Sequence, residues 1–68
     1  MYRIVETDYR KVYYMGDMVH REDGPAVIYS DGRHEWVLYC SCLSFNNYCK
    51  ELNLSDEDKV VMKLKYGQ

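Results

Sequence analysis

The fold is decided at His20-Arg21-Glu22-Asp23-Gly24-Pro25-Ala26, a stretch that contains the only proline of the chain. Strand-forming residues lie on both sides of it, at 12–15 and 27–29. Gly24 suits a backbone bend with a positive φ, and Pro25 fixes φ while donating no hydrogen bond. We therefore expect hairpins around this corner and helices that close over them.

Short strands joined by tight turns are predicted for residues 1–43. Gly16-Asp17 and Asp31-Gly32 are the predicted hairpin turns, because Gly and Asp tolerate the positive φ that such turns require. The longest strand is predicted for residues 34–42. The remaining strands are predicted at 2–7, 11–15, 18–20 and 26–29.

The hydrophobic pattern changes to a helical period after Ser44. Ser44 is the predicted N-cap of a first helix, which should end near Asn53. A second helix is predicted to begin at Ser55, with acidic residues in its first turn, and Gly67 can end it. The predicted apolar faces are Phe45, Tyr48, Cys49 and Leu52 in the first helix and Val60, Val61 and Leu64 in the second.

The chain of 68 residues has room for one domain. Its predicted fold is α+β: a small antiparallel β-hairpin sheet over residues 1–43, followed by two short C-terminal helices over residues 44–68. A chain of this length buries a modest fraction of its surface, yet it carries eight Tyr, four Met and three Cys. We therefore expect a homo-oligomer, in which a second copy covers part of the apolar surface.

Charge and hydropathy argue against several classes of partner. The formal net charge of −2 argues against binding to long nucleic acids. The sequence contains no apolar run of membrane-spanning length and no signal peptide, so we expect a cytosolic protein without membrane contact. Cys40, Cys42 and Cys49 lack zinc-site spacing and are interpreted as reduced packing residues.

The motif at residues 20–26, followed by Asp31-Gly32 and Glu35-Trp36, resembles a hairpin repeat that is common in short phage-encoded proteins. It is also distantly similar to membrane-occupation-and-recognition-nexus (MORN) hairpins. The similarity covers residues 12–43. The chain departs from the repeat at Tyr39-Cys40, where an Asn-Gly turn is usual.

A weak internal repeat accompanies this resemblance. Residues 12–19 align with residues 36–43, and the second copy leaves the repeat where the first helix begins. The second copy is therefore interpreted as a capping unit that closes a short array of hairpins.

The resemblance implies a small oligomeric phage protein that acts in the host cytoplasm. Phage proteins of this size include sponges, which sequester nucleotide signals of bacterial immunity. The expected function is therefore anti-defence: binding of a small nucleotide-derived immune signal without cleavage. Two alternatives are a protein–protein inhibitor of a host enzyme and a small hydrolase of the same signal.

Six residues form the candidate ligand-binding site. An Arg guanidinium suits phosphate, a neighbouring His can donate as well, and an aromatic ring can stack on a base. Trp36 and Tyr39 would lie on opposite faces of a regular strand, so one belongs to the core or an interface and the other is free to stack. His20 and Arg21 have an architectural alternative, in which they bond within the motif. The six candidates are His20, Arg21, Arg33, His34, Trp36 and Tyr39.

The sequence carries no pattern that identifies an enzyme. His20 with Glu22 or Asp23 could form an acid–base pair, but no motif places a Ser or Cys nucleophile. A Gly-rich phosphate loop and a metal-ligand cluster are absent from the sequence. The acidic run 56–58 is interpreted as a helix start. We therefore expect no catalytic residues, no metal and no cofactor.

Overall fold

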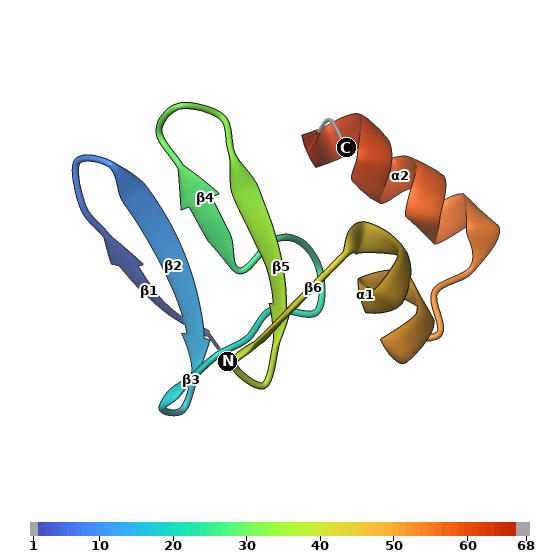
Figure 1. The fold of residues 1–68 in the computed structure, drawn as a ribbon, viewed down its shortest axis with the longest axis horizontal. Coiled ribbons are helices and arrows are strands. Elements are labelled where there is room, and N and C mark those ends of the chain that lie inside the picture. Colours follow the sequence, from blue (N-terminus) through green and yellow to red (C-terminus); the bar gives the residue numbers. More distant parts are fainter. Residues whose placement is uncertain (1, 67–68) are drawn as a thin grey trace.

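The computed structural model describes residues 2–66, and it is an α+β fold, as expected: an antiparallel sheet followed by two helices. The strands are β1 (Arg3–Glu6), β2 (Arg10–Met15), β3 (Met18–Val19), β4 (Val27–Tyr29), β5 (His34–Leu38) and β6 (Ser41–Leu43), and the helices are α1 (Phe45–Glu51) and α2 (Asp56–Tyr66). The strand order is β1-β2-β4-β5-β6, with β3 also paired to β2. Figure 1 shows β1 and β2 at one end of the molecule and both helices at the other.

The two predicted glycine turns are confirmed. Gly16-Asp17 joins β2 to β3, and the Asp31-Gly32 turn lies between β4 and β5. Gly16 has φ of 62° and Gly32 has φ of 96°, and both positions have open space around them. These two turns therefore require glycine for its backbone conformation, because only glycine adopts such a positive φ without strain.

The prediction of one strand over residues 34–42 is wrong. Tyr39 and Cys40 form a two-residue turn between β5 and β6, with φ of 50° and 64°. Contacts from an earlier part of the chain hold this turn: the Cys40 N–H donates to the Val19 carbonyl, and the Tyr39 N–H donates to His20. A left-handed conformation costs a non-glycine residue about 1–2 kcal/mol. The tertiary hydrogen bonds offset that cost. The turn therefore forms without the Gly or Asn residues that would mark it in the sequence.

The two segments of the internal repeat each contain a hairpin turn, but the turns differ from the sequence alignment by one residue. The Met15–Met18 pair closes the β2–β3 hairpin, and the Leu38–Ser41 pair closes the β5–β6 hairpin. Gly16-Asp17 therefore corresponds to Tyr39-Cys40, rather than to residues 40–41.

Two clusters of buried side chains form the core, and β5 contributes to both. Val37 faces one cluster while Trp36 and Leu38 face the other, because successive side chains of a strand point to opposite sides of the sheet. β5 is therefore covered on both faces. The sheet cluster consists of Val12, Ala26, Val27 and Val37, and the helix cluster of Trp36, Leu38, Tyr48 and Cys49.

Both helices begin where their caps predict. The Asn47 N–H donates to Ser44 Oγ at 3.2 Å, and the Asp58 N–H donates to Ser55 Oγ at 3.1 Å. Between the helices, Asn53 has φ of 54°. The predicted helix-ending role of Gly67 lies outside the described residues. Neither helix is long and apolar enough to cross a membrane within residues 2–66.

The predicted apolar face of α2 is wrong. Val60, Val61 and Leu64 are 57%, 44% and 80% exposed. The helix packs on the helix cluster through Met62 and Tyr66 instead. Residues four apart share a helix face, so the sequence of α2 offers two apolar stripes, and the one that carries the large Tyr66 ring reaches Trp36.

The three cysteines are free thiols. Cys49 is buried in the helix cluster, as expected for a packing residue. Cys40 and Cys42 are exposed, which contradicts the packing role predicted for them. The exposure of both residues results from the Tyr39-Cys40 turn. Because of this turn, Cys40 and Cys42 belong to the β5–β6 hairpin at the edge of the sheet and not to one long strand.

Candidate ligand-binding site

His20 is fully buried and bonded at both ring nitrogens. Its Nδ1 accepts from the Tyr39 N–H at 3.0 Å, so Nε2 carries the proton and donates to Glu22 Oε2 at 2.8 Å. The ring also lies 4.3 Å from the Tyr39 ring, between centroids. His20 therefore joins the end of β3 to the β5–β6 turn and offers a ligand no accessible atom.

Arg21 is held in a similar way by its neighbours. Its Nε donates to Asp23 Oδ1 at 2.8 Å, its Nη1 to the Pro25 carbonyl at 3.2 Å and its Nη2 to the Tyr66 hydroxyl at 3.3 Å. The guanidinium carbon lies 3.9 Å from the centroid of the Tyr13 ring. Burial lowers the pKa of Arg21, but Asp23 and the two Tyr rings outweigh burial, so the net pKa is raised. Arg21 thus fastens the motif to α2.

Gly24 and Tyr48 complete this corner, and sequence reasoning missed how they act together. Gly24 is not in the positive-φ region; a Cβ there would lie 2.8 Å from the Tyr66 hydroxyl and 2.9 Å from Arg21 Cζ, so the ends of these two side chains would have to shift. The buried Tyr48 hydroxyl donates to the Arg21 carbonyl at 2.6 Å and accepts from the Gly24 N–H at 3.3 Å. Backbone groups of the motif therefore bind the hydroxyl of one tyrosine of α1.

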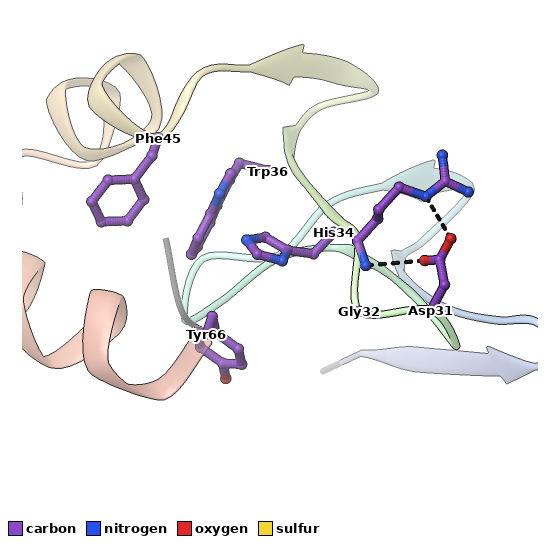
Figure 2. A pocket seen from close by; sticks show the side chains of 7 residues that line it. Asp31, Gly32, His34, Trp36, Phe45 and Tyr66 are labelled. Atoms are coloured by element: carbon purple, nitrogen blue, oxygen red, sulfur yellow. Dashed lines mark hydrogen bonds and ion pairs between the residues drawn. The ribbon is translucent and has the colours of Figure 1, made fainter.

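Three of the six candidates lie together elsewhere. Arg33, His34 and Trp36 line an open hollow of about 710 Å³ beside the turn between β4 and β5 (Figure 2). Trp36 is only 4% exposed, so it forms part of the floor and cannot stack fully on a ligand. The remaining lining residues are Asp31, Gly32, Phe45 and Tyr66.

Arg33 stands at the rim of this hollow, paired with Asp31. Arg33 Nε donates to Asp31 Oδ2 at 2.8 Å, and the Arg33 backbone N–H donates to Oδ1 at 3.1 Å. The backbone bond, followed by the guanidinium, lowers the pKa of Asp31. Within residues 2–66 the two terminal nitrogens of the guanidinium have no hydrogen-bond partner.

His34 contributes an unsatisfied polar atom to the same hollow. Its Nε2 is buried and has no hydrogen-bond partner among the described residues. The ring stands edge-on to Trp36, with centroids 5.6 Å apart and planes at 87°. Buried polar atoms in folded proteins are normally satisfied, so this nitrogen is an unsatisfied group in the wall of the hollow.

The structure does not bring Tyr39 to this hollow. Tyr39 follows the last residue of β5, and the two ends of this five-residue strand are about 13 Å apart. It is 60% exposed and lines a different hollow with Glu22 and Leu43. Of the two aromatic candidates on this hairpin, Trp36 is thus the core residue and Tyr39 the exposed one.

Phe45 and Tyr66 are the lining residues that sequence reasoning did not assign to a site. Phe45 lies 4.8 Å and Tyr66 6.0 Å from the Trp36 ring, between centroids (Figure 2). Phe45 was recognisable only as a residue of a helical stripe. The position of Tyr66 depends on which stripe of α2 packs, and no local signal decides that.

No known protein family, curated protein or solved structure matches this chain. The resemblance to phage hairpin repeats and to MORN hairpins therefore stays a prediction. Among residues 2–66, no three His, Cys, Asp or Glu side chains are grouped for metal binding.

Proposed function

We propose that the chain is a binding protein that holds a small nucleotide-like anion in the hollow beside β5, without cleaving it. The observation that carries this proposal is the buried, unpartnered His34 Nε2 at a hollow that Arg33 also lines. With the resemblance to phage proteins, this makes the chain an anti-defence sponge that sequesters an immune signal in the host cytoplasm.

The proposed ligand pose follows from the chemistry of the lining residues. A phosphate binds the terminal nitrogens of Arg33, which retains its Nε bond to Asp31. His34 Nε2 donates to a phosphate oxygen or accepts from a ligand amino group, according to its tautomer. The flat ring of the ligand then lies against Phe45 and Tyr66, which enclose the other side of the hollow.

Asp31 favours a particular kind of anion. Its carboxylate already occupies one side of Arg33, so a ligand with high charge density is repelled there. A ligand that combines one or two phosphate groups with an aromatic base suits the hollow better than inorganic phosphate. Cyclic dinucleotides and adenosine-diphosphoribose derivatives have this chemistry.

Calorimetric titration with these two ligand classes tests the proposal. Arg33→Ala should lose about 1.5–3 kcal/mol of binding free energy, the range for a charge-assisted contact. Arg33 lies over the Tyr29 ring, with its guanidinium carbon 4.8 Å from the ring centroid. Arg3→Ala is the matched control, because Arg3 lies at the same distance over the Tyr14 ring on the edge strand β1, and its loss should leave the affinity unchanged.

Recovery of the ligand after heat denaturation separates the related functions. A sponge returns the ligand intact, whereas a hydrolase returns product. If no member of the panel binds the wild-type chain, the sponge proposal fails, and the protein–protein inhibitor becomes the better hypothesis.

A further inference from the structure

The outer face of α2 carries apolar side chains that nothing in residues 2–66 covers. Val60, Val61 and Leu64 lie on the side of the helix opposite Met62 and Tyr66, which pack on the helix cluster. A helix with apolar residues on both sides is typical of one that is packed on both sides. The outer face therefore needs an occupant.

The charges that flank this apolar row identify the occupant. The first turn of α2 is acidic (Asp56, Glu57 and Asp58), and the basic Lys63 and Lys65 lie in its last turn. At 100° per residue, Asp56 and Lys63 lie along one border of the row and Asp58 and Lys65 along the other, while Glu57 lies within the row at its N-terminal end. Each border thus begins with a carboxylate and ends with an ammonium group.

We infer that the outer face of α2 pairs with the same face of a second copy, with the two helices antiparallel. A two-fold axis near Val60 and Val61 places the acidic start of each helix beside the basic end of the other. Along one border Asp56 of one copy then meets Lys63 of the other, and Asp58 meets Lys65 along the second border. A parallel pair would place like charges together instead, which is destabilising.

The interface is small, so we expect the association of the two copies to be weak. α2 has 11 residues and is about 16 Å long, so the pair buries less surface than a stable obligate dimer does. The dimer should therefore form in a concentration-dependent way in the micromolar to millimolar range. Arg33 and His34 are not part of this face. If the dimer does not form, the proposed function is therefore unaffected.

Sedimentation equilibrium between about 10 µM and 1 mM tests the first part of the inference. Leu64→Gln should raise the dissociation constant of the dimer about tenfold or more, because it removes an exposed apolar side chain from the row. Ile4→Gln is the matched control: it removes an exposed aliphatic side chain from β1 and should leave the constant unchanged. A wild-type chain that is monomeric at 1 mM, or equal effects of the two variants, would overturn the inference.

Charge reversal tests the orientation of the two helices. Lys63→Glu should raise the dissociation constant about tenfold, and Asp56→Lys added to it should restore the wild-type value within about threefold. Circular dichroism of each variant shows whether α2 is retained. Loss without rescue in a helical double variant contradicts the antiparallel pair.

Discussion

Gly24 shows how a glycine can be favoured by the space around it rather than by backbone freedom. Gly24→Ala should destabilise the fold by about 1 kcal/mol, because the new methyl group displaces the ends of the Tyr66 and Arg21 side chains. Urea unfolding of Gly24→Ala measures this cost. In a Tyr66→Phe background the closest atom is gone, so the same substitution should cost less. An equal cost in both backgrounds would show that the Tyr66 hydroxyl is not the obstacle.

The Tyr48 hydroxyl is a second single group on which the stability of the fold depends, and it makes that stability depend on pH. Tyr48→Phe should cost about 1–3 kcal/mol near neutral pH, because it leaves buried backbone groups of Arg21 and Gly24 without a partner. Burial raises the pKa of Tyr48 above its ordinary value of 10.0. The stabilisation is therefore fully present below that pH and is lost as pH rises above it.

Unfolding curves at several alkaline pH values check this assignment. The difference in stability between wild type and Tyr48→Phe should shrink above the ordinary tyrosine pKa. A difference that stays constant into strongly alkaline solution would mean that Tyr48 titrates alike in the folded and unfolded chains.

At the scale of the elements, the β5–β6 turn is strained by its own residues. Cys40→Gly should stabilise the fold by up to about 1 kcal/mol, because glycine adopts the positive φ of this position without a Cβ clash. Thermal unfolding measures the change. Cys42→Gly, in the β6 strand, should instead destabilise, since glycine weakens a strand interior. Destabilisation by both variants would contradict the assignment of strain to Cys40.

The elements that local chemistry determines were predictable from the sequence. Ser44 and Ser55 cap the two helices, and Gly16 and Gly32 supply the positive φ of their turns. The residues of the Tyr39-Cys40 turn carry no local turn signal, because bonds from His20 and Val19 hold it, and only the resemblance to hairpin repeats indicated a turn there. Local signals decide elements only where no distant contact competes with them.

At the scale of the whole molecule, the candidate site was predictable in part. Arg33 and His34 are adjacent to a recognisable turn, and this placed them together at the rim of a hollow. Phe45 and Tyr66 join them only through the packing of both helices on Trp36. Such long-range packing leaves no mark in the local sequence pattern, so these two of the seven lining residues were not predicted.

The position of β5 between the two clusters of buried side chains has a consequence for how the chain folds. Neither cluster can form until the same five residues are in place, and α1 and β2 reach that strand from opposite directions along the chain. A transition state that lacks β5 would have neither half of the core. Folding should thus be a single all-or-none step whose nucleus contains this strand.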